Sequence, residues 1–107
     1  MNVQFKKGVL ELCVLALLDQ KDRYGYELVQ LISEQIQISE GTIYPLLRKL
    51  TQEEYFTTYL QESTEGPPRK YYQLTKKGRT YLYHLIEEWN DFSQGVNAII
   101  KKGVPHE

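Results

Sequence analysis

The segment from Val9 to Leu18 is the strongest constraint on how this chain folds. Every residue in it except Glu11 is apolar, and residues that favour helices dominate it. A helix that is apolar nearly all round must be covered on more than one side. The segment is also too short to cross a bilayer, which takes about 20 apolar residues. We therefore expect no membrane span but a central core helix, which can in addition contact a second subunit.

The size and charge of the chain bound its possible partners. With 107 residues it is too short for two ordinary domains. A monomer of this length buries only about 60–65% of the surface that its unfolded chain exposes, so leftover apolar surface favours oligomerisation. Because the formal net charge is −1, affinity for nucleic acid has to come from local clusters of basic residues. The single cysteine, Cys13, excludes an intramolecular disulfide and fits a reducing cytoplasm.

Two amphipathic helices follow the core helix. Asp22 can cap the first of them. Its apolar residues recur at helical spacing at Tyr24, Leu28, Leu31 and Ile32. Ser39 can cap the next helix, whose apolar stripe is formed by Ile43, Leu46, Leu47 and Leu50. Pro45 suits only a first helical turn, so Thr42 is an alternative cap, and the start of this helix stays open.

A β-hairpin and a long helix complete the chain. Residues 55–62 and 70–74 are prone to form strands, and the loop between them spans residues 63–68. Thr75 can cap the last helix, which Gly103 and Pro105 end. Apolar residues of this helix are spaced alternately 3 and 4 apart, which is the pattern of a dimerisation seam: Leu82, Leu85, Trp89, Phe92, Val96 and Ile99.

The predicted fold is therefore mainly α with a β-hairpin. The order of three helices, hairpin and helix is what a winged helix-turn-helix domain requires. We assign residues 1–74 to a winged helix-turn-helix DNA-binding domain and residues 75–103 to a C-terminal dimerisation helix of the same compact unit. Residues 104–107 form a tail.

Charge and hydrogen-bonding groups favour DNA as the partner. Tyr44 can bond a phosphate, and Arg48 and Lys49 can pair with phosphates or guanine edges. Residues 66–86 carry basic residues and no acidic one. Lys76 and Lys77 oppose the dipole of the last helix, so an external anion is their expected partner. We predict these DNA-binding residues: Ser39, Thr42, Tyr44, Arg48, Lys49, Arg69, Lys70 and Lys76.

Three motifs together resemble the PadR family of bacterial transcriptional regulators. They are Tyr24-Gly25-Tyr26-Glu27-Leu28, the segment 41–50 and the segment 66–79, and they occur in the family's order. The resemblance implies a homodimeric winged-helix repressor whose third helix enters the major groove and whose wing contacts the flanking backbone. A two-fold dimer of this kind should bind an inverted-repeat operator. It also implies that the last helix dimerises with the first helix of the partner. One departure is Glu54, where the family usually has Gly, so we expect that turn to be built differently.

Other functions are disfavoured by the residues present. The sequence contains no phosphate-binding Gly-rich loop or nucleophile elbow, and His84 fits a partly exposed helix position better than a ligand or base. We therefore expect no enzyme activity, no metal site and no cofactor. A protein-protein interaction module on a winged-helix fold is the alternative function, and it would leave the basic residues without a phosphate partner.

The single tryptophan suggests an effector site. Trp89 occupies the middle of the apolar seam, and paired indoles suit a coiled coil poorly, so the helices can diverge around a planar aromatic ligand. Leu85 and Phe92 would line this site. Glu88 and Asp91 are near enough in sequence to favour a cationic ligand. The alternative is that Trp89 serves only dimer packing.

Overall fold

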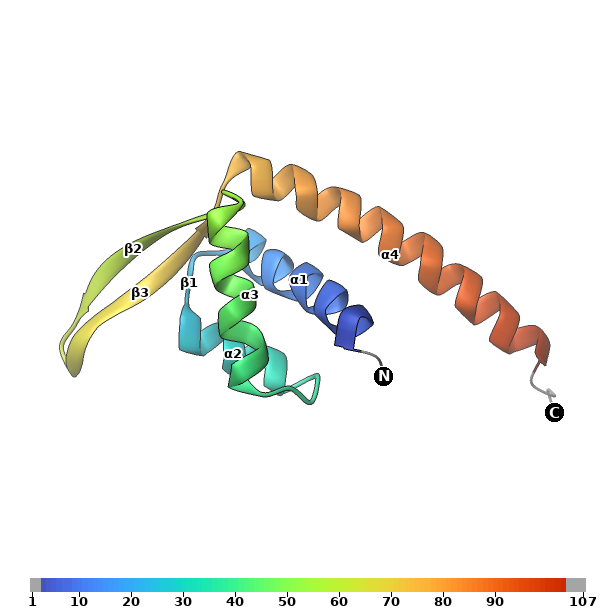
Figure 1. Ribbon diagram of the computed structural model, residues 1–107, viewed down its shortest axis with the longest axis horizontal. Helices are drawn as coiled ribbons and strands as arrows, with labels where there is room; N and C mark the ends of the chain where they lie inside the picture. Colours follow the sequence, from blue (N-terminus) through green and yellow to red (C-terminus); the bar gives the residue numbers. More distant parts are fainter. Residues whose placement is uncertain (1–2, 104–107) are drawn as a thin grey trace.

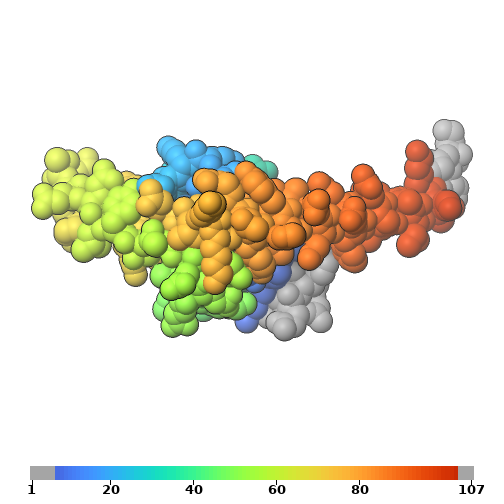
Figure 2. Space-filling view, turned by 90° about the horizontal axis from the view of Figure 1, so that it is seen from above, coloured from blue at the N-terminus to red at the C-terminus, as the bar shows by residue number. Residues whose placement is uncertain are grey.

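The structure is a computed structural model that describes the backbone of residues 3–103 and the side chains of residues 7–103. Three helices form its body: α1 (Val3–Gln20), α2 (Gly25–Ser33) and α3 (Glu40–Gln52). The short strand β1 (Arg23–Tyr24) pairs with a hairpin of β2 (Phe56–Ser63) and β3 (Gly66–Leu74), and α4 (Lys76–Gly103) follows. The hairpin and the far end of α4 project from opposite ends of the body (Figures 1 and 2). The fold class predicted from the sequence is confirmed.

Helix α1 is the centre of the core. Leu10, Val14 and Leu15 are fully buried, and Leu18 is nearly so. The helix contacts α2, α3, β3 and α4, so it is covered on several sides, as its apolar composition required. No helix among residues 3–103 is both long enough and apolar enough to span a bilayer.

Helix α2 begins later than the sequence predicted. Tyr24 is its N-cap residue, and the Glu27 carboxylate accepts a hydrogen bond from the Tyr24 amide at 3.4 Å. Asp22 is not the cap, because its carboxylate accepts a bond from the hydroxyl of Tyr59 at 2.7 Å. The buried face of α2 also differs from the predicted one. Val29, which was not predicted to face the core, is buried, whereas Leu31 is only partly buried.

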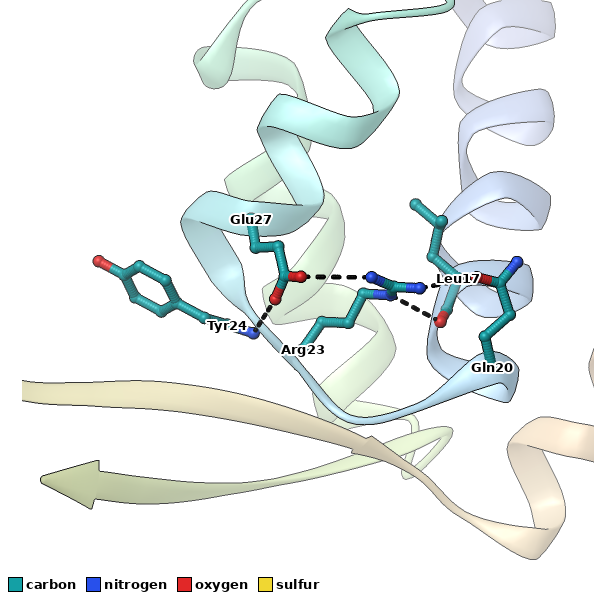
Figure 3. Close-up of polar contacts among 5 residues, drawn as sticks. All are labelled: Leu17, Gln20, Arg23, Tyr24 and Glu27. Atoms are coloured by element: carbon teal, nitrogen blue, oxygen red, sulfur yellow. Dashed lines mark hydrogen bonds and ion pairs between the residues drawn. The ribbon is translucent and has the colours of Figure 1, made fainter. Parts of the chain in front are cut away.

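A buried arginine joins α1 to α2 (Figure 3). The guanidinium of Arg23 donates to the Leu17 carbonyl at 3.0 Å and to Gln20 at 2.7 Å, and it forms an ion pair with Glu27 at 3.2 Å. These contacts satisfy a charge that is costly to bury alone. These contacts fix the position of Arg23, which with Tyr24 forms β1. The sequence pattern did not predict this strand of two residues.

Helix α3 begins at Glu40 with Ser39 as its N-cap, so the alternative cap at Thr42 is wrong. Pro45 therefore lies in the second turn, where it cannot donate to the carbonyl of Gly41. The helix accommodates this loss because Gly41 and Pro45 are both exposed, so water can bond the free carbonyl of Gly41. The predicted core stripe is confirmed, with these residues buried: Ile43, Leu46, Leu47 and Leu50.

The turn after α3 corrects another expectation. Glu54 adopts the left-handed conformation with φ 65°, so this turn has the geometry usual with glycine. The Tyr55 amide donates to the Leu50 carbonyl, and the Glu54 amide donates to the Thr51 carbonyl, both at 3.0 Å. These bonds form a Schellman motif, which satisfies the last carbonyls of α3.

The sheet is antiparallel with strand order β1-β3-β2. The hairpin loop is shorter than predicted, because Ser63 pairs with Gly66 and both prolines lie in β3. Two features make room for Pro67 and Pro68. β1 pairs with β3 only at Tyr71 and Tyr72, which leaves one edge of β3 open near the tip, and the register with β2 is irregular between Gln61 and Ser63 on the other edge.

Helix α4 has the cap that the sequence predicted. The hydroxyl of Thr75 accepts a hydrogen bond from the Gly78 amide at 2.9 Å. Gly78 packs so closely on the backbone of Tyr55 that a Cβ atom would collide with it. Leu82 is buried, but the outer part of the apolar seam is 38–72% exposed: Trp89, Phe92, Val96 and Ile99.

Candidate nucleic-acid interface

The outer side of α3 presents two rows of residues to different neighbours. Tyr44 and Arg48, one turn apart, face the β-hairpin and line a pocket beside β3. Thr42, Pro45 and Lys49 face α1 and line a second pocket there. The predicted recognition residues therefore divide between two faces of one helix.

The pocket on the hairpin side combines basic and tyrosine side chains. We call it the tyrosine–basic pocket. It has a volume of about 280 Å³ and is lined by Tyr24, Gly25, Tyr26, Tyr44, Arg48, Lys70 and Tyr72. The structure thus brings together Arg48 of α3 and Lys70 of β3, which are 22 positions apart in the sequence. Two cations beside several hydroxyl donors form a surface suited to a phosphate group.

Glycine and tyrosine packing shapes this pocket. A Cβ at Gly25 would lie 3.2 Å from the ring of Tyr72 and 3.6 Å from that of Tyr44, so glycine lets both rings close on the start of α2. Burial is the main cause that raises the pKa of Tyr44 and of Tyr72. Both hydroxyls are therefore protonated near neutral pH and can donate hydrogen bonds.

The two basic residues of the hairpin point to opposite faces of β3. Lys70 lies on the pocket side, with its ammonium 5.9 Å from the ring centre of Tyr72. Arg69 lies over the ring of Tyr24 at 5.1 Å, beside Tyr71, whose ring centre is 6.1 Å from that of Tyr24. Alternation along a strand causes this separation. Arg69 and Lys70 therefore point to opposite faces of β3, although the ring under Arg69 is that of Tyr24, which also lines the tyrosine–basic pocket.

The remaining predicted DNA-binding residues occupy different surroundings. Lys49 forms an ion pair of 3.6 Å with Glu11 of α1. Ser39 and Thr42 share a hydrogen bond of 3.3 Å between their hydroxyls. Lys76 is exposed at the first position of α4, beyond the base of the hairpin.

Two basic residues of the acid-free segment have partners inside the protein. The ammonium of Lys77 donates to the Glu53 carbonyl at the end of α3 at 2.9 Å. Arg79 pairs with Asp19 of α1 at 2.9 Å. The expectation that Lys77 awaits an external anion is therefore wrong, since a helix C-terminus attracts its charge.

Sequence reasoning missed four members of the tyrosine–basic pocket, which are Gly25 and three tyrosines. Tyr24 and Tyr26 flank Gly25 in the first motif, and Tyr72 was assigned only to a strand. The one local signal for these residues was the first motif, in which a glycine separates two tyrosines. Their proximity to Arg48 depends on how α2, α3 and β3 pack, which no local pattern reveals.

A third pocket, which is mainly apolar, lies between α1 and α4. It measures about 440 Å³, and it is lined by Gly8, Val9, Leu12, Leu85, Glu88, Trp89 and Phe92. All three predicted effector residues therefore line one hollow. Glu88 is thus one of the lining residues, whereas Asp91 is not. Within the described part of the chain, no group of three or more His, Cys, Asp or Glu side chains is placed to hold a metal ion.

Comparison with known proteins identifies the family of this winged-helix fold. The model of the PadR-like family of transcriptional regulators matches residues 14–97. The chain belongs to this family. PadR-like proteins are DNA-binding transcriptional regulators that typically dimerise and are generally not enzymes.

Solved structures of similar proteins agree with this assignment. A transcriptional regulator from Streptococcus is 45% identical, with a TM-score of 0.81 over 90% of this chain and 96% of its own. A PadR-like transcriptional regulator from Bacillus cereus is 39% identical, with a TM-score of 0.82 over 91% and 96%. A protein from Streptococcus mutans is 36% identical, with a TM-score of 0.84 over 94% of each chain.

Proposed function

We propose that this PadR-like protein is a ligand-responsive repressor that binds an inverted-repeat operator as a homodimer. The observation that carries the DNA-binding part is the tyrosine–basic pocket. It combines Arg48 of α3 with Lys70 of the hairpin. A phosphate bound there would fix the register of α3 on the duplex, because backbone contacts position a protein while base contacts specify sequence.

The exposed side of α3 carries the proposed sequence readout. Thr42 reaches base edges in the major groove. Arg48, Tyr44 and Lys70 bind a phosphate of the flanking backbone, and Lys49 binds another. Arg69, Lys76 and Ser39 contact the backbone around this centre. Two-fold symmetry then sets the half-site centres about 10 base pairs apart, or a multiple of that.

The exposed apolar seam of α4 supports the homodimer. Trp89, Phe92, Val96 and Ile99 form one continuous stripe, and the outer half of α4 extends beyond the body (Figure 1). Exposed apolar stripes of this kind mark protein interfaces. We propose that this stripe, with Leu85, covers α1 and α4 of a second copy. Leu82, which the sequence also assigned to the seam, is only 1% exposed and belongs to the core of its own protomer.

The pocket between α1 and α4 is the proposed effector site. Its walls include Leu85, Trp89 and Phe92, which suit a planar aromatic compound, and Glu88 favours a cationic one. Because the pocket adjoins the proposed dimer seam, a ligand there would shift α4 and thereby the spacing of the two α3 helices.

The DNA-binding proposal is tested by isolating the genomic fragments that the protein retains and measuring affinity against salt. Replacing Arg48 or Lys70 by Ala should weaken binding and lower the salt slope by about 0.9 for each lost phosphate contact. Arg79→Ala is the matched control, because Arg79 is paired with Asp19. Affinity that is independent of salt and of all these changes would instead support the protein-interaction module.

The effector proposal is tested by titrating planar aromatic cations and phenolic acids while following Trp89 fluorescence. Saturable quenching that accompanies weaker operator binding is expected. Trp89→Leu should abolish the effect on DNA binding while the apoprotein still binds its operator. A response of the Trp89→Leu variant equal to that of the wild type would place the effector elsewhere.

A further inference from the structure

A buried carboxylate lies where three helices meet. Glu11, the one charged residue in the apolar part of α1, is only 8% exposed. A buried carboxylate is costly unless it has hydrogen-bonding or charged partners. The function proposed above assigns Glu11 no role, although it lies between the proposed recognition helix and the helix of the proposed dimer seam.

The two oxygens of Glu11 have partners on different helices. Oε1 accepts a hydrogen bond of 2.8 Å from the hydroxyl of Tyr81 on α4. Oε2 lies 3.6 Å from the ammonium of Lys49 on α3. One carboxylate therefore connects α4 with α3 across α1.

The two partners differ in how firmly they are held. The ring of Tyr81 stacks on that of Tyr55 with 4.3 Å between their centres and 9° between their planes, so its position follows that of α4 and of the turn after α3. The side chain of Lys49 is 57% exposed, and such ion pairs contribute little to stability. Lys49 can therefore exchange Glu11 for a phosphate, whereas Tyr81 leaves Glu11 only if α4 moves.

We propose that Glu11 is a positioning residue through which α4 controls the contact of Lys49 with DNA. With the Tyr81 hydroxyl in place, Glu11 has a donor and releases Lys49 to a phosphate. When α4 shifts and the hydroxyl withdraws, Lys49 is the remaining partner of a buried charge and is held away from the duplex. DNA affinity thereby depends on the position of α4 without any change in the recognition residues.

This inference rests on the proposed DNA binding, and Glu11→Gln is its first test. Gln keeps an oxygen that accepts the Tyr81 hydroxyl but removes the charge that attracts Lys49. We expect tighter operator binding and a salt slope that is steeper by up to about 0.9 per protomer. Glu87→Gln, which removes an exposed charge of α4, is the control for net charge. In a Lys49→Gln background, Glu11→Gln should not tighten binding.

Tyr81→Phe is the second test, and it has the opposite sign. It keeps the ring that stacks on Tyr55 but removes the hydroxyl, so operator binding should weaken. The double variant Glu11→Gln/Tyr81→Phe should bind as Glu11→Gln does, because no charge then holds Lys49. Thermal unfolding and circular dichroism confirm that each variant is folded.

The outcomes separate this inference from the proposed function. Salt-dependent operator binding by the wild type, with Glu11→Gln no tighter than Glu87→Gln, would overturn the role of Glu11 alone. The same conclusion would follow if Tyr81→Phe weakened binding equally with and without Glu11→Gln. If the wild type retains no DNA at all, the proposed function itself fails.

Discussion

Glu54 shows how one residue is held in a conformation that its side chain disfavours. Its φ of 65° places it in the left-handed region. Its neighbours hold it there, because the hydroxyl of Thr75 contacts the carbonyl oxygens of Glu54 and Tyr55 at 2.7 and 3.0 Å. These contacts connect the end of α3 to the start of α4, so the turn is needed although its residue is strained.

Replacing Glu54 by Gly should relieve this strain. A left-handed conformation costs a non-glycine residue about 1–2 kcal/mol, part of which is offset by the greater freedom of glycine in the unfolded chain. We expect the free energy of unfolding to rise by about 1 kcal/mol in urea denaturation. Glu53→Gly is the control, because Glu53 has a φ of −83° and gains nothing from glycine. An equal rise in both variants would contradict this explanation.

At the scale of the element, α3 reconciles two demands on one helix. Its buried face packs on the core, while its outer face carries small and polar residues, among them Gly41 and Pro45. Pro45 costs the helix one hydrogen bond, because it has no amide that could donate to the Gly41 carbonyl. The local helix is therefore less stable than its core stripe alone would make it.

Pro45→Ala should stabilise α3 by restoring the amide that bonds the Gly41 carbonyl. Proline inside a helix costs about 3 kcal/mol, and the position near the first turn reduces this. We expect the free energy of unfolding to rise by about 1–2 kcal/mol. Pro67→Ala in the hairpin, where no helix is involved, should change it by less than about 0.5 kcal/mol. A fall in stability for Pro45→Ala would show that the proline ring packs usefully against its neighbours.

The contact between α1 and α4 makes stability sensitive to alkaline pH. Burial and the hydrogen bond to Glu11 raise the pKa of Tyr81 well above its ordinary value near 10. Above about pH 10, which is the ordinary pKa of tyrosine, the unfolded chain loses the Tyr81 proton while the folded protein keeps it. The free energy of unfolding therefore falls as the pH rises. Tyr81→Phe should make the slope of the free energy of unfolding against pH shallower, by an amount that corresponds to at most about one bound proton. Urea denaturation at several pH values from about 9 to 11 measures this slope. Tyr83→Phe, at an exposed position of α4, is the matched control.

The molecule as a whole is elongated, with extents of 57 × 27 × 22 Å. Figure 2 shows the hairpin and α4 projecting from a small central body. Most of its large apolar side chains lie either in one core around α1 or in the exposed seam of α4, and Leu60 of β2 is exposed outside both. A chain of this size with such a seam gains stability by association, so dimerisation and folding are expected to be coupled.

A charge in the seam should break the proposed dimer. Val96→Glu buries a carboxylate in an apolar interface, whereas Gln94→Glu places the same residue on the opposite side of α4. We expect Val96→Glu to sediment as a monomer with a lowered melting temperature and Gln94→Glu to sediment as a dimer. A Val96→Glu dimer as tight as the wild type would show that the seam is not the interface.

The sequence by itself determined the parts of this protein that depend on neighbours along the chain. Helical spacing predicted the apolar face of α3 and the seam of α4, and the Thr75 cap was recognisable because a cap involves residues within one turn. The tertiary structure alone decided which residues meet from distant segments. Tyr81 and Glu11 are 70 positions apart, and Asp22 bonds Tyr59 37 positions away instead of capping α2. Such contacts form only once α1 is packed against α2, α3, β3 and α4, because packing of the whole core then fixes the helices and strands against one another.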